Sequence, residues 1–333
     1  MRHLLARADG RGHAVMKAAS HRAVPLQRVG ALRLAALRWL AGCLGFFAGW
    51  AALAQSVTLL LSEPGGIYLE AAQALRQELE VGNGLRIRQQ ILSERRPGEA
   101  EDLVVALGVR AYAAALSEPG GTPVLALLVP RQTYERLLAE RGQGGPWRPV
   151  GGLYLDQPPA RQLQLLQLAL PGTRRVGVLV GADSTEQAEA LAEAARSARL
   201  QLQTQTVSSP GELFTALGVL SGQAQALLLL PDASVVNRGT LQSLLLQTYR
   251  ERLPVVGYSA ALADAGAILG LYATPAQLGR EAAQLIRTVF RGGELRLPPP
   301  RYPETFSLRI NRSVARSLGL VLPAEAELTS RLR

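Results

Sequence analysis

The chain beyond residue 54 contains no histidine, no cysteine and no lysine. The three histidines, the single cysteine and the single lysine all lie before that point. Without histidine and cysteine, this part of the chain cannot form Cys/His zinc sites, disulfides, or catalytic groups of the Ser-His-Asp and Cys-His types. Without lysine, it also lacks Schiff-base chemistry and the lysine of a phosphate-binding loop. All-carboxylate metal sites and acid–base chemistry by Asp and Glu remain open, but we expect a binding protein with no cofactor and no metal ion.

Aromatic residues make up only 5% of the chain, and Trp147 is the only tryptophan after residue 54. This scarcity argues against a ligand cage built mainly from aromatic rings. The net charge of +10 is concentrated at the N-terminus, because residues 1–54 hold eight of the 36 Lys and Arg but one of the 26 Asp and Glu. The remainder carries 28 basic and 25 acidic residues, so we expect no nucleic-acid partner. The apolar content of the whole chain is 48%, which is sufficient for an ordinary hydrophobic core.

The N-terminal segment has the pattern of an export signal. Arg33 and Arg38 precede an apolar run over residues 39–54, which ends in Ala-Leu-Ala. A basic region, an apolar region and an A-x-A site together describe a secretory signal peptide. The apolar run is shorter than the ~20 residues that a membrane span needs. We expect cleavage after Ala54 and a periplasmic mature protein that begins at Gln55.

Two features of this segment leave alternatives open. The sequence Leu-Ala-Gly-Cys at residues 40–43 resembles a bacterial lipobox, in which Cys43 would be lipidated and would anchor the protein to a membrane. The apolar residues that follow Cys43 argue against lipidation, because a lipoprotein tether is usually polar. Residues 1–30 form an unusually long basic extension, and Met16 is an alternative start.

Short apolar runs alternate with helical patterns from residue 57 to residue 318. Buried strands of a parallel sheet are short and apolar, and each is followed by a crossover helix. The pattern predicts strands over 57–61, 85–92, 103–107, 123–129, 153–155, 176–180, 200–207, 226–230, 254–258, 266–271 and 306–310. It predicts helices over 67–79, 109–116, 132–141, about ten residues from Ala160, 185–198, 210–220, 238–251, 275–291 and 312–318. Such alternation indicates parallel sheets covered by helices on both faces.

A central stretch, residues 151–181, separates two such series of strands and helices. Its Pro158-Pro159 pair cannot continue a strand, but it can open a helix because proline lacks the N–H that is unpaired there in any case. A Pro171-Gly172 pair ends that helix before the next buried strand. We interpret the stretch as the crossover from one α/β lobe to a second.

Two segments resemble a known family. The sequence YLDQPPARQLQLLQLALPGTRRVGVLVG (154–181) resembles the segment that joins the lobes in ABC-transporter substrate-binding proteins of the tryptophan/tyrosine-binding type. Residues 264–323 resemble the C-terminal signature of that family. This signature consists of a Gly-Ala-led strand, a Leu-Gly-Arg helix, a Gly-Gly stop, a proline-rich run, and an Asn-X-X-X-Ala-X-X-Leu-Gly-Leu ending. The resemblance covers residues 150–323 well and residues 56–149 mainly by strand order.

The resemblance implies an α/β fold of two doubly wound parallel-sheet lobes joined by a three-strand hinge, as in type I periplasmic binding proteins. Residues 56–155 and 265–303 would form the N-terminal lobe. Residues 156–264 and 304–323 would form the C-terminal lobe, and 324–333 a tail. The chain would therefore cross back near Gly266 and again near Phe306.

The resemblance also implies a function. The protein would be a monomeric, exported solute-binding protein that captures a small molecule between its lobes and delivers it to an ABC permease in the inner membrane. Two alternatives remain. One is a periplasmic ligand-sensing subunit that docks to a membrane receptor or kinase. The other is a cleft enzyme, which would need paired carboxylates about 5 to 9.5 Å apart.

The identity of the ligand does not follow from the resemblance. Family members often carry Arg-Pro-Gly-Gly-Asn before the crossover, whereas residues 146–152 read Pro-Trp-Arg-Pro-Val-Gly-Gly. A His-Pro pair after the first strand is common in the family, whereas residues 62–66 read Ser-Glu-Pro-Gly-Gly. Both departures fall where ligand contacts are expected, so the family's amino-acid ligands are not carried over to this chain.

Residues that directly follow strands are the candidate ligand contacts. In open α/β sheets, ligands bind beyond the carboxyl ends of the strands, where helix N-termini offer N–H groups and partial positive charge. The candidates in the first lobe are Ser62, Glu63, Gly65, Gly66, Tyr68, Gly108, Arg110, Pro130, Arg131 and Tyr134. Those in the second lobe are Asp183, Ser184, Asp232, Ser234, Tyr258 and Ser259, and those at the crossover are Tyr154 and Asp156.

Each candidate also has a structural alternative as a helix cap, a turn, a solvated charge or a core residue. Asp156 is the strongest candidate. A charged residue at the end of an apolar strand, followed by Pro158-Pro159, needs a defined partner. That partner would be an amine of the ligand or N–H groups of the hinge.

Overall fold

The computed structural model describes residues 55–80, 85–96, 101–141, 148–209, 211–291 and 295–332. The predicted signal peptide, the alternative lipidation of Cys43 and the alternative start at Met16 lie outside these residues. Within them, no helix combines the length and the apolar character that crossing a membrane requires. No group of three or more His, Cys, Asp or Glu side chains in the described ranges could hold a metal ion.

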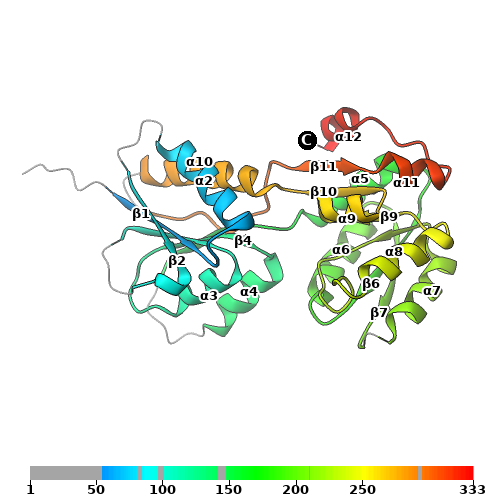
Figure 1. Ribbon diagram of the computed structural model, residues 1–333, viewed down its shortest axis with the longest axis horizontal. Helices are drawn as coiled ribbons and strands as arrows, with labels where there is room; N and C mark the ends of the chain where they lie inside the picture. The colour runs from blue at the N-terminus through cyan, green and yellow to red at the C-terminus, as the bar shows by residue number, and fades with distance from the viewer. Residues whose placement is uncertain are drawn as a thin grey trace, which may run out of the picture. The chain divides into compact units, whose positions relative to one another are not determined.

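The first lobe is built on a five-stranded sheet in which all neighbouring strands are parallel (Figure 1). The strand order is β2-β1-β3-β4-β5. The central strands are apolar and buried on both faces, as expected for a parallel sheet between two layers of helices. The strands are β1 (Ser56–Leu61), β2 (Arg86–Ile91), β3 (Leu103–Leu107), β4 (Val124–Val129) and β5 (Val150–Tyr154).

Helices cover both faces of this sheet (Figure 1). One face packs against α2 (Gly66–Glu80) and α10 (Pro275–Arg291), and the other against α3 (Val109–Ser117) and α4 (Arg131–Glu140). A short 3-10 helix, η1 (Leu92–Glu94), follows β2. Helix α10 comes from the C-terminal part of the sequence and crosses closely over α2. A Cβ atom at Gly279 would lie 2.3 Å from the carbonyl oxygen of Ala71, so only glycine permits this approach.

The second lobe is built on a six-stranded sheet with the order β11-β10-β9-β8-β6-β7. Its strands are parallel except for the last pair, in which β11 runs antiparallel to β10. If strands are counted from the start of each lobe, the first five follow the same order as in the first lobe. The strands are β6 (Arg175–Val180), β7 (Gln201–Thr206), β8 (Ala226–Leu228), β9 (Val255–Gly257), β10 (Leu269–Tyr272) and β11 (Ser307–Ile310).

This second sheet is also enclosed by helices. Along β6, Val176, Val178 and Val180 contact one helix layer, and Leu179 contacts the other. The first layer contains α5 (Pro159–Ala169), α6 (Thr185–Ser197), α11 (Arg312–Ser317) and α12 (Glu325–Leu332). The second contains α7 (Leu213–Gln223), α8 (Leu241–Arg250) and α9 (Ala260–Ala265).

The chain passes between the two lobes three times. It leaves the first sheet after β5, returns between β10 and α10, and leaves again before β11. The predicted return near Gly266 is wrong in one respect. Strand β10 pairs with β9 and β11, so residues 269–272 belong to the second sheet and the return lies at Ala273-Thr274. The apolar, Gly-Ala-led strand gave no signal of which sheet it would join.

Other differences from the sequence prediction are local. Helices α9 and α12 were not predicted, because the first has only six residues and the second lay in the segment interpreted as a tail. Strand β5 begins earlier than predicted, at Val150, and includes Gly151 and Gly152. A Cβ atom at Gly151 would lie 2.9 Å from the carbonyl oxygen of Pro298, so glycine here allows the proline-rich segment to pack beside the strand.

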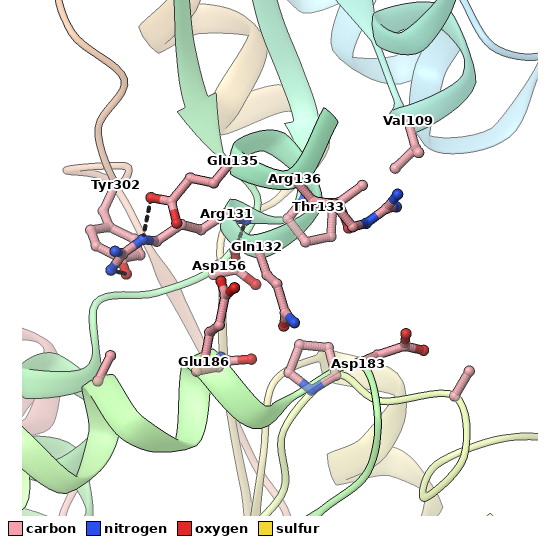
Figure 2. A pocket seen from close by; sticks show the side chains of 15 residues that line it. Val109, Arg131, Gln132, Thr133, Glu135, Arg136, Asp156, Asp183, Glu186 and Tyr302 are labelled. Carbon is pink, nitrogen blue, oxygen red and sulfur yellow. Dashed lines mark hydrogen bonds and ion pairs between the residues drawn. The ribbon is translucent and has the colours of Figure 1, made fainter. Parts of the chain in front are cut away.

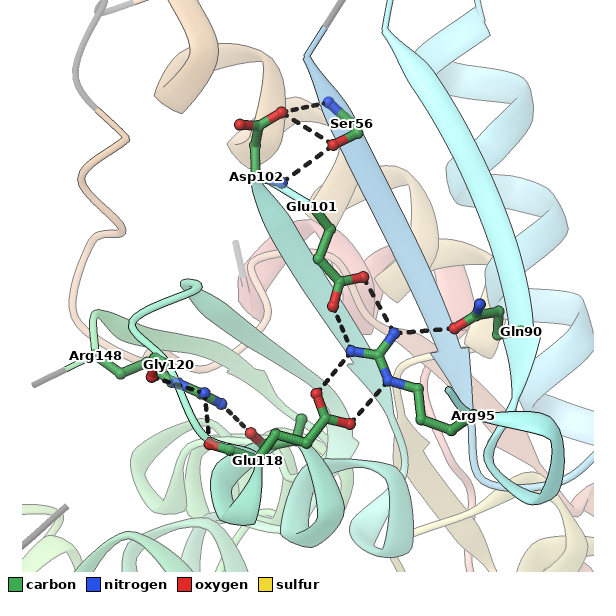
Figure 3. A network of polar contacts seen from close by, with 9 residues as sticks. Ser56, Gln90, Arg95, Glu101, Asp102, Glu118, Gly120 and Arg148 are labelled. Carbon is green, nitrogen blue, oxygen red and sulfur yellow. Dashed lines mark hydrogen bonds and ion pairs between the residues drawn. The ribbon is translucent and has the colours of Figure 1, made fainter. Parts of the chain in front are cut away.

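Charged residues are buried in the first lobe, away from the site described below (Figure 3). The guanidinium group of Arg95 donates hydrogen bonds to the carboxylates of Glu101 and Glu118, and all three side chains are largely buried. These two carboxylates raise the pKa of Arg95 further above its usual value. Arg148 donates to the carbonyl oxygens of Ala115, Glu118 and Gly120, and thereby satisfies the C-terminus of α3. We interpret these contacts as structural.

Candidate functional site

The carboxyl ends of the strands in both sheets border one pocket of about 410 Å³ (Figure 2). In doubly wound sheets with this strand order, ligands bind beyond the strand ends at the point where the order reverses. Six charged residues border this space, so we call it the charged pocket. Its lining residues are Val109, Pro130, Arg131, Gln132, Thr133, Glu135, Arg136, Asp156, Asp183, Glu186, Gln187, Ala190, Pro231, Ala233 and Tyr302.

A second pocket of about 250 Å³ adjoins the first and shares four residues with it, namely Pro130, Asp156, Gln187 and Pro231. Most of its remaining wall is apolar, so we call it the apolar pocket. Asp156 is the only charged residue among the described residues that line it. The other lining residues are Ile67, Leu128, Leu155, Gln157, Gln162, Tyr258, Ser259, Leu271, Tyr272, Ala273 and Pro275.

Asp156 lies where the two pockets meet. It follows β5, and its carboxylate accepts a hydrogen bond from the backbone N–H of Arg131, the first residue of α4. A carboxylate at this position is stabilised by the partial positive charge of the helix N-terminus. Burial nevertheless raises the pKa of Asp156 above its usual value, because this N–H does not fully replace the lost water.

Arg131 contacts two other side chains that line the charged pocket. Its Nε donates to Glu135 at 2.7 Å, and one terminal nitrogen donates to the hydroxyl of Tyr302 at 3.1 Å (Figure 2). The guanidinium carbon also lies 6.0 Å from the centre of the Tyr302 ring. These contacts raise the pKa of Arg131, so its charge is permanent and already compensated.

Asp232 also lies beyond the carboxyl end of a strand, β8 of the second lobe, but its surroundings differ from those of Asp156. It is 2% exposed, and its carboxylate accepts hydrogen bonds from the hydroxyls of Ser184 and Ser234 and from the backbone N–H groups of Asp183 and Ser234. Burial alone would raise the pKa of Asp232, but these hydrogen bonds outweigh it and lower the pKa below its usual value. Asp232 thus stabilises the loop after β6 and lines neither pocket.

The candidate residues that follow β1 and β3 mainly contact one another or the start of α3. The hydroxyl of Ser62 accepts from the backbone N–H of Ala111 in α3, and Glu63 forms an exposed ion pair with Arg110 at 3.4 Å. Gly108 has φ of +95°, and a Cβ there would lie 2.4 Å from the ring of Tyr68. These candidates, with Gly65 and Gly66, lie outside the linings of both pockets.

Two of the predicted tyrosine contacts, Tyr134 and Tyr154, are core residues. Tyr134 stacks on Tyr112 with ring centres 5.0 Å apart, and it meets the edge of Tyr154 at 5.5 Å. Both predicted residues are at most 6% exposed. The row of rings reaches the charged pocket only through Tyr302, which contacts Tyr154 at 5.2 Å.

The structure therefore brings six candidates to the two pockets. Pro130, Arg131, Asp156 and Asp183 line the charged pocket. Pro130, Asp156, Tyr258 and Ser259 line the apolar pocket. Ser259 also accepts the N–H of Leu262 and so caps α9. Ser184 and Ser234 support the Asp232 loop instead of lining a pocket.

Several lining residues were not among the candidates. Most lie within the first turns of helices that begin directly after a strand, so extending each candidate set by one helical turn would have found them. Tyr302 lies in the proline-rich segment, for which the sequence offered no such signal. The missed polar residues are Gln132, Thr133, Glu135, Arg136, Glu186, Gln187 and Tyr302 in the charged pocket, and Gln157 and Gln162 in the apolar pocket.

Strand β4 is irregular beside the apolar pocket. Its register with β5 shifts between Leu127 and Val129, and Leu128 has φ of 60°. Bulges and left-handed residues of this kind redirect a strand and often occur beside binding sites. Here Leu128 and Pro130 both line the pocket, so the irregular end of β4 shapes part of its wall.

Comparison with known proteins identifies one family. A family model described as ABC transporter substrate binding protein matches residues 89–329. No curated protein matches the chain in sequence.

Solved structures resemble the fold at low sequence identity. A ligand-free, open substrate-binding protein with adhesive properties from Clostridium difficile has a TM-score of 0.66 and 16% identity, over 81% of this chain and 97% of that chain. An ABC domain in complex with L-Trp from Streptococcus pneumonia has a TM-score of 0.57 and 18% identity, over 84% and 98%. A conserved domain protein from Vibrio cholerae gives the same values. These similarities concern the fold alone, and they confirm the predicted two-lobed α/β class of type I periplasmic binding proteins.

Proposed function

We propose, from the premise that the chain belongs to the family of ABC transporter substrate-binding proteins, that it captures a small molecule in the charged and apolar pockets and delivers it to the permease of an importer. A solute-binding role follows from the family, whereas delivery, export and the identity of the contacts are our proposal. The observation that carries it is the position of Asp156. This residue lies at the junction of two pockets that collect residues from both sheets.

The three passages between the lobes are suited to a hinge. Hinges consist of a few residues at the ends of elements that absorb a change in backbone angles. Each passage is short, and polar contacts fix its ends. Buried Glu281 of α10 accepts the backbone N–H groups of Glu304 and Thr305, and Thr274 and Gln277 cap the start of α10 reciprocally. We expect the lobes to close over the solute by rotation about these passages, so that the closed form presents both lobes to the permease.

The experiment for capture is a thermal-shift screen of the purified full chain against amines, amino acids, sugars, nucleosides and organic acids. A solute that binds the folded state alone stabilises it by RT ln(1 + c/Kd), where c is the free solute concentration, so the unfolding temperature rises with the logarithm of that concentration once it exceeds the dissociation constant Kd. We expect at least one class to stabilise the protein. If the protein is folded and no class has any effect, capture of a small solute is wrong.

Delivery and export need separate measurements. Deleting the gene should abolish uptake of the stabilising solute by cells, and uptake should return with the wild-type chain. Unchanged uptake, combined with a changed cellular response to the solute, would indicate a sensing subunit instead.

Mass spectrometry of the mature protein should find Gln55 at its N-terminus. A lipid-modified Cys43 would contradict the proposed cleavage.

A further inference from the structure

We propose that the two pockets select an organic cation: an amine or amidine on an apolar body that carries a hydrogen-bond acceptor and no carboxylate. The inference rests on the proposed function, because it names the class of solute for the same site. It differs from a site for amino acids, whose carboxylate requires a compensating positive charge.

The charged pocket has an excess of negative charge. Its lining contains four carboxylates, those of Glu135, Asp156, Asp183 and Glu186, and two guanidinium groups. Figure 2 shows Asp156 entering the pocket from the first lobe, and Asp183 and Glu186 entering from the second. A bound cation would therefore meet acidic groups from both lobes.

Both arginines of the charged pocket are already paired. Arg131 donates to Glu135 at 2.7 Å, and Arg136 donates to Glu140 at 2.8 Å. The side-chain carboxylates of Asp183 and Glu186 have no ion-pair partner within the described part of the chain. The uncompensated charge of the pocket is thus negative, and a ligand carboxylate would find no free guanidinium group.

The two helix N-termini that border this pocket also carry carboxylates of the protein. The first N–H of α4 donates to Asp156. Helix α6 has Glu186 in its first turn, and Asp183 precedes it. Helix N-termini attract anions through their N–H groups and partial positive charge. Here that attraction is offset by acidic side chains, so the usual anion site of this fold is closed to a ligand carboxylate.

Two buried polar atoms lack partners and lie at the pockets. The side-chain oxygen of Gln132, in the charged pocket, accepts no hydrogen bond from any described residue. The side-chain nitrogen of Gln157, in the apolar pocket, donates none within the same described ranges, although this residue is only 4% exposed. The Gln157 oxygen accepts from Arg161 at 2.8 Å, which fixes the orientation of the amide.

These two atoms define complementary ends of a ligand. Buried polar atoms are normally hydrogen-bonded, and an unpaired one favours a ligand that supplies the missing partner. Gln132 requires a donor, as an ammonium or amidinium group provides, on the acidic side of the site. Gln157 requires an acceptor, such as a hydroxyl oxygen, among apolar walls. Asp156, which borders both pockets, would contact the cation where it joins the apolar body.

The test uses three probes with one ring and different charges: tyramine, L-tyrosine and 3-(4-hydroxyphenyl)propionate. Isothermal titration calorimetry with the full chain should give tyramine a dissociation constant at least about tenfold below that of L-tyrosine, and the carboxylate the weakest binding. Phenethylamine lacks the hydroxyl acceptor for Gln157, and it should bind about threefold to tenfold more weakly than tyramine.

Amino-acid substitutions test whether tyramine binds in the charged pocket. Glu186→Gln and Asp156→Asn should each weaken tyramine binding about tenfold, because each removes a negative charge that faces the cation. Glu189→Gln is the matched control, since Glu189 is an exposed acid on the same helix α6 and lines neither pocket. It should leave the affinity unchanged. Circular dichroism of each variant verifies the fold.

Three results would overturn the inference. If L-tyrosine or 3-(4-hydroxyphenyl)propionate binds more tightly than tyramine, the site supplies positive charge to a ligand carboxylate. An equal effect of Glu186→Gln and Glu189→Gln would place tyramine outside the charged pocket. Binding of a sugar, nucleoside or organic acid with no response to the amines would reject the cation while leaving solute capture intact. If no solute of any class binds, the proposed function fails with it.

Discussion

Asp156 and Asp232 each follow a strand at the carboxyl edge of a parallel sheet, yet their surroundings are opposite. Asp232 accepts four hydrogen bonds from its own and a neighbouring loop, and its pKa is lowered. Asp156 accepts one hydrogen bond from another element, from the backbone N–H of Arg131, and its pKa is raised by burial. The carboxylate of Asp232 is therefore fully hydrogen-bonded within the fold, whereas that of Asp156 keeps acceptor capacity that the fold does not use.

The neighbouring residues explain this difference. The loops around Asp232 supply donors, since Ser184 and Ser234 contribute hydroxyls as well as backbone contacts. Asp156 is followed after one residue by Pro158 and Pro159, which have no N–H to donate. A carboxylate in such a loop must find its partners elsewhere. An aspartate beyond the carboxyl end of a strand can therefore be fully hydrogen-bonded by the fold or keep unused acceptor capacity, depending on the donors that its loop supplies.

The largest expected effect is on stability. Asp232→Ala would leave four donor groups without their acceptor and should lower the free energy of unfolding by about 3 kcal/mol. Asp156→Ala loses one contact at a partly exposed position and should cost about 1 kcal/mol or less. Urea unfolding of both variants measures the difference. Equal losses would contradict the distinction between the two aspartates.

A substitution beside Asp232 tests how tightly the Asp232 loop is packed. In Gly181→Ala, the new Cβ would lie 1.9 Å from the hydroxyl of Ser234 and 2.7 Å from the carboxylate oxygens of Asp232. The cluster must then shift, and we expect a loss of about 2 kcal/mol. Gly211→Ala is the control, because a Cβ there meets nothing within 4 Å and the change should stay within about 0.5 kcal/mol. Similar unfolding midpoints for the two variants would mean that the Asp232 loop is loosely packed.

The pH dependence of stability gives the smallest effect, and its sign differs between the two aspartates. The lowered pKa of Asp232 means that its contribution is present above the ordinary value of 3.8 and is lost as the pH falls through the lower folded-state pKa. The raised pKa of Asp156 has the opposite consequence: its contribution is present below 3.8 and is lost as the pH rises through the higher folded-state pKa. The free energy of unfolding, measured between pH 3 and 7, should therefore change less with pH at the acidic end for Asp232→Asn than for the wild-type protein. For Asp156→Asn, stability should fall less as the pH rises. Reversed signs would reject both assignments.

Much of the fold followed from the sequence because buried parallel strands and their helices leave a strong pattern. Strand β3 and helix α10 have the predicted bounds, and the family is confirmed by its model. The sheet to which β10 belongs could not be predicted, because pairing partners depend on long-range contacts that an apolar run does not encode. Helix α9 was missed because one and a half turns carry too little periodicity.

The position of the charged pocket at the ends of the strands was predictable, but most of its lining residues were not. Arg131, Asp156 and Asp183 were found by their place after strands, and all three line the charged pocket. Tyr134 and Tyr154 satisfied the same rule, yet their rings turn into the core against Tyr112 and Tyr302. The side of a helix or strand on which a ring packs depends on neighbours from distant segments, and the sequence does not reveal these neighbours one residue at a time.

Calorimetric titration of wild-type protein and Asp156→Ala with the solute that stabilises the protein best tests most directly whether Asp156 binds the solute. Because we propose that Asp156 contacts that solute, the variant should keep its fold and lose at least about tenfold in affinity, or about 1.4 kcal/mol. An unchanged dissociation constant in a folded Asp156→Ala protein would show that Asp156 does not contact the solute.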